Sequence, residues 1–395
     1  GTHNFTYDYT TAGHPGLASV TVPHIVGHSV NYTYDALGRR TGMQLKNDGV
    51  DVLANQYAYD VRNRLATVGN GAYTAHYTRQ PGTGLLTQTD IKNNSATTVM
   101  STTRTYDQYH RLTGISSAAP GNAASTRTYS YDYNTKDQRA RCTMADGSSW
   151  EYTYDTKGQV IGGVKKDASG KAIPGQSFGY AYDDIGNRLS EQRGMAENEI
   201  KYTTNSANQY VRREFKGMVP IIGEADADAV VKAIRNDTDA IFPARAITAT
   251  RDGKYFKAWF YTDNTAAAKT VPYSVYAIKH DSALNQDLVE KKDGSCNVPK
   301  AVEPLTYDLD GNMLTDSEWT YAWDGENRMI LAVNTAGTQK LEFAYDYMGR
   351  RVSKKVFNCE PGTANWQLAK HERYVYDGWN VIAVFDAANV MQKSY

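Results

Sequence analysis

The 395-residue chain has little of what marks several common protein classes. It has three widely spaced cysteines, Cys142, Cys296 and Cys359, with no CxxC pair and no zinc-type spacing. This excludes a disulfide scaffold or a cysteine-rich zinc module, and leaves open one disulfide or three separate thiols. No run of 18 or more apolar residues occurs, so no membrane-spanning helix is predicted.

Neither sign of charge dominates the sequence. Lysine plus arginine and aspartate plus glutamate both total 43 residues. A neutral balance argues against nucleic acid as the partner, because nucleic-acid binding usually needs a basic face. Phosphate-loop, GxSxG and catalytic-cysteine signatures are also missing. We therefore predict no catalytic residue, cofactor or metal site. The chain starts at Gly1 rather than methionine, and we expect a fragment or a processed piece.

Tyrosine and glycine are abundant, with 30 tyrosines against nine phenylalanines and 32 glycines. Tyrosine, threonine and valine with frequent glycine and asparagine is a composition of strands and turns. Long apolar runs with the 3.6-residue period of a helix are missing. The sequence therefore predicts an all-β protein.

One phrase, written "YDALGRR" from Tyr34, recurs along the chain with small changes. Self-similarity of this kind indicates a repeat architecture. Ten copies are clear, anchored at Tyr34, Tyr59, Tyr106, Tyr131, Tyr154, Tyr182, Tyr307, Trp323, Tyr345 and Tyr376. Aspartate follows every anchor, and the fourth position after the anchor is glycine in five copies, asparagine in three and histidine in one.

Each phrase predicts the tip of a β-hairpin. Aspartate at the first turn position accepts backbone N–H bonds, and glycine or asparagine three residues later tolerates a positive φ. The flanking stretches, such as "NYTYD", alternate aromatic and small residues as strands do. The predicted structural turn residues are Asp35, Gly38, Asp60, Asn63, Asp155, Gly158, Asp183, Gly186, Asp308, Gly311, Asp346 and Gly349.

The repeated phrase, with the passage "YDLDGNMLTDSEWTYAWDGENRMI" from Tyr307 to Ile330, resembles the YD repeat of the bacterial Rhs (rearrangement hotspot) family. It is also similar to the C components of insecticidal toxin complexes and to teneurins. The resemblance covers roughly 1–210 and 304–395. It implies an antiparallel β-hairpin ribbon that spirals into a hollow shell, which in bacterial members holds a toxic C-terminal domain. The D-P-x-G core region of full family members is missing here, so neither a toxin nor an autoprotease is assigned.

A stretch without the phrase separates Tyr182 from Tyr307. Two alternating patterns, "ATRDGKYFKAWFYTDN" and "VPYSVYAIKHD", predict strands there. "GEADADAVVKAIRNDTDAIF" is compatible with a helix or with a hairpin. We predict three parts: a first repeat sheet over 1–211, a small immunoglobulin-like β-sandwich inserted at a hairpin tip over 212–303, and a second repeat sheet over 304–395.

Some side chains allow weaker chemical interpretations. Asp226 and Asp228 with Asn236–Asp239 could bind one cation, but no EF-hand spacing supports such a site. His24 and His28 have helical spacing, but Pro23 and Gly27 disfavour a helix there. Exposed tryptophans can stack on sugar rings. The candidate glycan contacts are Trp150, Trp319 and Trp379, whereas Trp323 replaces an anchor tyrosine and is expected to pack in the sheet.

Two functions remain open at this level. The first is a non-catalytic structural shell segment, whose partners are further repeats or a C-terminal effector domain of the same protein. The second is a cell-surface adhesin that binds glycans, or other copies of the chain through edge strands. Both imply a bacterial protein that is secreted or held at the cell surface.

Overall fold

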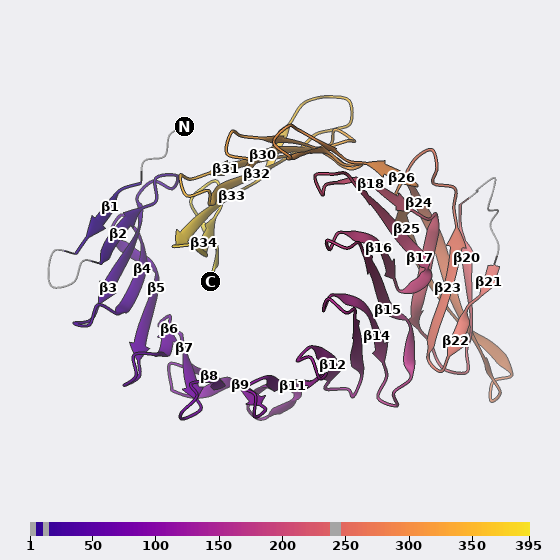
Figure 1. Cartoon of the computed structure of the whole chain (residues 1–395), viewed down its shortest axis with the longest axis horizontal. Coiled ribbons are helices and arrows are strands. Elements are labelled where there is room, and N and C mark those ends of the chain that lie inside the picture. Colours follow the sequence, from indigo (N-terminus) through magenta and orange to yellow (C-terminus); the bar gives the residue numbers. More distant parts are fainter. Residues whose placement is uncertain (1–4, 11–15, 238–245) are drawn as a thin grey trace. The chain divides into compact units, whose positions relative to one another are not determined.

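The structure, a computed structural model, describes residues 5–10, 16–237 and 246–395. These residues form strands and turns and contain no helix, which confirms the all-β prediction. The chain divides into two compact units, with residues 1–128 and 318–395 in unit 1 and residues 129–317 in unit 2. Figure 1 labels many of the strands of both units.

Unit 1 consists of two runs of consecutive strands. In each run, from β1 to β10 and from β29 to β35, every strand pairs antiparallel with the next. The first run comprises β1 (Tyr7–Tyr9), β2 (Leu17–Thr21), β3 (His28–Tyr34), β4 (Arg40–Asn47), β5 (Val50–Tyr59), β6 (Leu65–Gly69), β7 (Tyr73–Arg79), β8 (Leu86–Asn93), β9 (Thr98–Tyr106) and β10 (Leu112–Ala119). The second comprises β29 (Trp319–Trp323), β30 (Met329–Asn334), β31 (Gln339–Tyr345), β32 (Arg351–Asn358), β33 (Gln367–Asp377), β34 (Asn380–Phe385) and β35 (Met391–Ser394).

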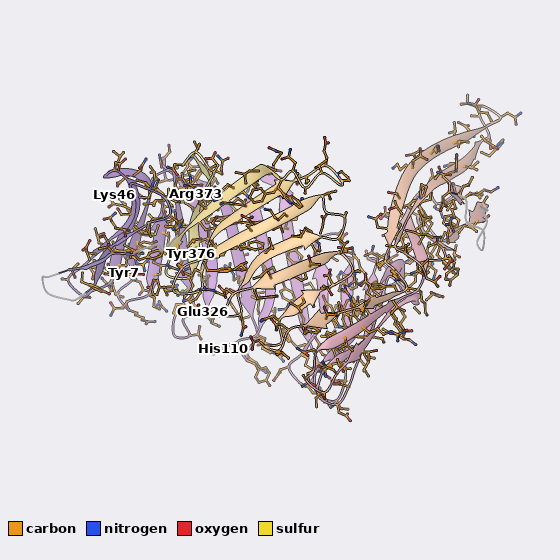
Figure 2. All side chains as sticks on the ribbon, turned by 90° about the horizontal axis from the view of Figure 1, so that it is seen from above. Tyr7, Lys46, His110, Glu326, Arg373 and Tyr376 are labelled. Atoms are coloured by element: carbon orange, nitrogen blue, oxygen red, sulfur yellow. The ribbon has the colours of Figure 1, made fainter. Side chains whose placement is uncertain are left out.

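The core of unit 1 joins the two ends of the sequence. Val30 of β3 and Met43 of β4 are buried in one cluster with Val375 of β33 and Phe385 of β34. Polar contacts reinforce this seam: the Tyr32 hydroxyl donates to Asp377 Oδ1 at 3.0 Å, and Arg40 forms an ion pair with the same carboxylate. Arg373 and Tyr376, labelled in Figure 2, lie on β33 beside it.

Unit 2 continues the same antiparallel hairpin pattern. Consecutive strands pair from β11 to β18, β18 then pairs with β26, and β27 pairs with β28. These strands are β11 (Asn122–Tyr133), whose last residues belong to this unit, β12 (Arg139–Met144), β13 (Ser149–Tyr154), β14 (Val160–Lys166), β15 (Ala172–Tyr182), β16 (Arg188–Arg193), β17 (Met195–Thr204), β18 (Tyr210–Phe215), β26 (Val302–Pro304), β27 (Thr306–Tyr307) and β28 (Met313–Thr315).

An inserted region lies between β18 and β26, whose pairing of Arg212 with Pro304 closes its base. It contains β19 (Met218–Glu224), β20 (Val230–Arg235), β21 (Ala246–Thr248), β22 (Thr250–Asp252), β23 (Tyr255–Tyr261), β24 (Lys269–Asp281) and β25 (Gln286–Val298). They form two sheets, ordered β19-β23-β22 and β21-β20-β24-β25. The ambiguous stretch around Val230 is therefore a strand, because both of its edges pair in the second sheet.

The inserted sheets share a core of their own. Val219 and Phe256 of the first sheet pack with Val231 and Val271 of the second. The insert also touches the repeat strands, because Ile222 lies against Gly175 of β15. The division at 212 and 303 and the immunoglobulin-like kinship stay predictions.

Candidate functional site: the turn edge of the repeat strands

The repeated phrase forms one hydrogen-bonded turn, seen clearly at Asp35. Its Oδ1 accepts the N–H groups of Leu37 at 3.0 Å and Arg39 at 2.9 Å, and its Oδ2 accepts Arg39 Nε at 2.7 Å. The backbone N–H of Asp35 donates to the Arg39 carbonyl at 3.0 Å, and Gly38 closes the loop with a φ of 75°. A single carboxylate thus satisfies three donors of the turn.

The same bonds recur at the other tips of both units. Oδ1 accepts the N–H groups two and four residues on at Asp60, Asp107, Asp155, Asp183, Asp308, Asp324 and Asp346. The residue that closes each turn has a positive φ, as at Asn63, His110, Gly158, Gly186, Gly311, Asn327 and Gly349. His110 and the turn residue Glu326 are labelled in Figure 2.

Two copies differ from the sequence-based assignment. In the copy anchored at Tyr131, Asp132 still belongs to β11, and the turn begins at Asn134 and closes with Asp137 at a φ of 60°. The copy at Tyr376 is a tight hairpin in which Asp377 pairs with Asn380. The Asp377 carboxylate therefore contacts Tyr32 and Arg40 in the core of unit 1 instead of bonding to its own turn.

Sequence reasoning did not single out several further turns of the same kind, among them those at Asp386 and Asn205. Asp386 accepts the N–H groups of Ala388 and Val390, and Asn205 accepts those of Ala207 and Gln209. Both lack a tyrosine directly before them, so a search for the Tyr-Asp pair does not find them. The sequence signal that could have found them is an aspartate or asparagine followed three residues later by asparagine or glycine, as Asp386 is followed by Asn389.

Hydrogen bonding within the turn lowers the pKa of six of the turn aspartates, which are Asp35, Asp60, Asp107, Asp183, Asp308 and Asp324. The backbone and guanidinium N–H groups of Arg64 lower the pKa of Asp60 to about 2, and the side chain of Arg39 lowers that of Asp35. Donors to a carboxylate favour its ionised form. These side chains are therefore charged turn formers at neutral pH, which explains aspartate at this position.

The anchor tyrosine links successive hairpins through its hydroxyl. Tyr59 donates to the carbonyl of Arg40 at 2.8 Å, and Arg40 is the residue paired with Tyr34, the preceding anchor. Tyr345 donates to Met329 at 2.8 Å, and Tyr376 donates to Arg351 at 2.8 Å. The same bond is made by Tyr34, Tyr106, Tyr154 and Tyr307 to Leu17, Leu86, Arg139 and Tyr210, respectively. We call this contact the tyrosine clamp.

The clamp gives a physical reason for tyrosine rather than phenylalanine. The carbonyl it reaches lies at a shift in strand register, for example between Thr33 and Tyr34 opposite Arg40. Such irregularities leave backbone groups without a ladder partner. In one repeat Arg79 replaces the tyrosine and donates to the Leu65 carbonyl at 2.6 Å. Sequence reasoning placed the anchor tyrosines at the ends of strands, as at Tyr34 and Tyr59, but did not foresee this acceptor.

Neighbouring tips also touch along the turn edge. Arg39 Nη1 donates to Asn63 Oδ1 at 2.7 Å, and Lys157 Nζ donates to the carbonyl of Asp184 at 2.7 Å. In the other run of unit 1, Arg328 Nη1 donates to the Asp346 carbonyl at 3.2 Å. The turn edge is thus a ladder of polar contacts, and its aspartates are already used by backbone and guanidinium donors.

The weaker chemical candidates occupy structural positions. Asp226 and Asp228 lie 2.8 and 3.6 Å from Lys279 Nζ, while Thr238 and Asp239 lie outside the described residues. His24 Nε2 lies 2.8 Å from the Tyr374 carbonyl, and the buried His28 ring packs on Phe385. Within the described ranges, no group of three or more histidine, cysteine, aspartate or glutamate side chains has a metal-binding arrangement.

The three candidate glycan contacts do not share an environment. Trp150 is half-buried on β13 and its ring lies 5.6 Å from that of Phe178. Trp319 is half-buried at the start of β29. Trp379 lies at the turn between β33 and β34 and is 66% exposed. Trp150 belongs to unit 2 and the other two to unit 1, and their role as glycan contacts stays a prediction.

No family model matches this chain. Among curated proteins it is similar to the tRNA nuclease WapA of Bacillus subtilis (strain 168), with 35% identity over 97 residues. That match spans 24% of this chain and 4% of WapA. The tRNA3(Ser)-specific nuclease WapA of Bacillus spizizenii matches to the same extent. The chain therefore covers a small part of these relatives.

Among solved structures, the chain is similar to TcdB2-TccC3-Cdc42, at 15% identity and a TM-score of 0.40. It is also similar to the Tc holotoxin pore of Photorhabdus luminescens, at 12% identity and a TM-score of 0.37. The matches cover 97% and 98% of this chain and 21% of each solved chain. The names of both structures include TccC3. Because identity and TM-scores are low, the fold assignment rests on this chain's own strand pairing.

Proposed function

We propose that this chain is a structural shell segment of an Rhs-type YD-repeat protein, which encloses or presents a C-terminal effector domain of the same protein. The tyrosine clamp is the observation that carries this proposal. At seven of the ten anchors it ties a hairpin to an earlier one through the backbone, so the repeats form a wall rather than separate binding modules. In this role the chain itself catalyses nothing, and its turn aspartates are structural.

The composition and the comparisons support this role. The chain is neutral, so a nucleic-acid partner is not expected. The residues that the structure describes include no helix with the length and apolar character of a membrane span. The nuclease names of the WapA relatives describe whole proteins, of which this chain matches 4%. We propose a secreted or surface-held bacterial protein in which any enzymatic activity belongs to another domain.

The direct test compares the natural full-length protein with a variant whose turns are broken. The variant replaces Gly158, Gly186 and Gly311 with valine, which resists the positive φ of these tips. We expect the wall to open and the C-terminal domain to become sensitive to protease. Valine at Gly325 is the matched control, because a Cβ added to that glycine meets no atom within 4 Å and its φ is not positive. Equal protease sensitivity of the C-terminal domain in all these proteins contradicts the proposal.

The adhesin alternative has a separate outcome. The exposed Trp379 is the side chain best placed for stacking on a sugar ring. Glycan-array binding by the isolated chain that is lost in Trp379→Ala would favour the adhesin. Absence of such binding leaves the shell segment as the function.

A further inference from the structure

The insert contains a groove of about 600 Å³ that the shell function does not use. It lies between the β19 edge of one inserted sheet and β24 and β25 of the other. Phe256, Val275 and Ala277 form an apolar floor, and Ile221 and Leu288 lie on its two sides. A concave, largely apolar site of this volume is typical of a binding site.

Two strand edges without a ladder partner border the groove. Within the described part of the chain, the 7-residue β19 pairs only with β23, and the 13-residue β25 pairs only with β24. Each strand therefore presents a row of backbone N–H and C=O groups at its other edge. Pro220 in β19 lacks an N–H, so β25 is the better edge for accepting another strand.

The strand register shows which β25 side chains face the groove without being covered by the opposite sheet. Ala277 of β24 pairs with Glu290 of β25, and Lys279 pairs with Leu288. Leu288, which lies on the same face as Ala277, remains 46% exposed. The inner faces of two packed sheets normally cover each other. Here the three-stranded sheet ends at β19, and β25 is exposed from Gln286 to Asp293.

The charged side chains at the rim are paired with one another. Lys292 Nζ lies 3.4 Å from Glu290, and Lys279 Nζ lies 2.8 Å from Asp226. Across the groove, Glu224 pairs with Lys254 at 3.0 Å. An occupant therefore needs no charge to neutralise the rim, but it needs backbone donors and acceptors for β25 and apolar side chains for the floor.

We propose that this groove accepts an extended strand from a different polypeptide, which adds to the free edge of β25. Its alternate side chains, small or apolar, would cover the exposed Leu288 and the half-buried Val275 and Ala277. The groove borders β25 from Leu288 to Gly294, which corresponds to a peptide segment of about 20 Å. A second copy of this chain is a poor occupant, because pairing two β25 edges would bring Lys291 and Lys292 of both copies close together, and like charges on paired strands are destabilising.

The test uses the full chain and a fluorescent octapeptide of alternating threonine and valine. We expect the peptide to bind in an anisotropy titration and to protect the amides of β25 from hydrogen exchange. A peptide with proline at alternate positions should not bind, because it lacks the N–H groups of one edge. Ala277→Phe fills the floor of the groove and should weaken binding at least about tenfold.

Ala283→Phe is the matched control, because it makes the same change at the exposed turn between β24 and β25, outside the groove. The proposal is overturned if Ala277→Phe and Ala283→Phe bind the peptide equally, or if the peptide protects no β25 amide in the unmodified chain. The exchange measurement needs no variant, so a misfolded Ala277→Phe does not decide the result. A dimer in sedimentation that Ala277→Phe abolishes would identify a second copy as the occupant and overturn the choice of a different polypeptide.

Discussion

The repeat strands and the insert are both antiparallel β-structure, yet they are stabilised differently. The insert buries residues such as Val219 and Val231 between two sheets. By contrast, repeat strands outside the core of unit 1, such as β8 and β10, contain no buried residue. A single layer cannot gain much from apolar burial. It depends instead on two kinds of hydrogen bond. The turn aspartates bond within each hairpin, and the tyrosine clamps connect one hairpin to another.

Removing the insert is the strongest way to test this difference. Residues 217–300 replaced by a short glycine-serine linker should leave the repeat strands folded, because β18 still pairs with β26 at the base. The measurement is hydrogen exchange of β12 to β17, compared with the intact chain. Loss of protection throughout those strands would show that the wall depends on the insert, for example through Ile222 on Gly175.

A cavity in the insert core should have the next largest effect. Phe256 is 7% exposed in the shared core, so Phe256→Ala should destabilise the insert by about 3–5 kcal/mol. Local hydrogen exchange should show this loss in β19 to β25. Leu189→Ala on β16, where the side chain is 44% exposed, is the control and should cost less than about 1 kcal/mol. Similar losses for the two variants would contradict the contrast between core and wall.

A turn glycine tests the wall itself. Gly186 has a φ of 98°, which a β-branched residue resists, so Gly186→Val should destabilise unit 2 by about 1 kcal/mol or more. Urea unfolding measures the change. Gly325→Val, at a turn position without positive φ, should be closer to neutral. If Gly325→Val is as damaging as Gly186→Val, the left-handed backbone is not the cause.

The tyrosine clamp predicts a smaller, specific effect. Tyr345→Phe keeps the ring but removes the donor to the Met329 carbonyl, and should cost about 1 kcal/mol. Tyr109→Phe, whose side chain is 69% exposed at a tip, should change stability little. The thermal unfolding midpoints of the two variants measure this difference in stability. An unchanged midpoint for Tyr345→Phe would mean that water replaces the clamp without cost.

Acid should weaken the turns, with the smallest effect per site. The folded-state pKa of Asp60 is about 2, below its value of about 4 in an unfolded chain. Its contribution to stability is therefore present above pH 4 and is lost as the pH falls towards 2. Asp60→Asn should flatten the pH dependence of the unfolding midpoint in that window. The exposed Asp184→Asn is the control, and equal slopes for the two variants would argue against the turn carboxylate.

Many turns of the repeat strands could be predicted from the sequence, because they depend on contacts between residues close together in the chain. An aspartate with glycine or asparagine three residues later sets a turn through contacts within five residues, so Asp35–Gly38 and Asp346–Gly349 follow from the sequence alone. The Tyr131 copy shows the limit of this reasoning. The sequence offers both Asp132 and Asn134 as the start of the turn, and the pairing of Asp132 with Arg141 in the strand ladder decides for Asn134.

The sequence by itself determined the all-β class, the hairpin repeat and the place where the repeat is interrupted, because these depend on residues close together in the chain. Only the tertiary structure decided the partners of distant groups. It placed the Tyr59 hydroxyl on the Arg40 carbonyl, Asp377 against Tyr32, and β25 beside an uncovered apolar groove. The physical reason is that such contacts depend on strand register and on which sheets face each other, and residue spacing does not encode either across hundreds of residues.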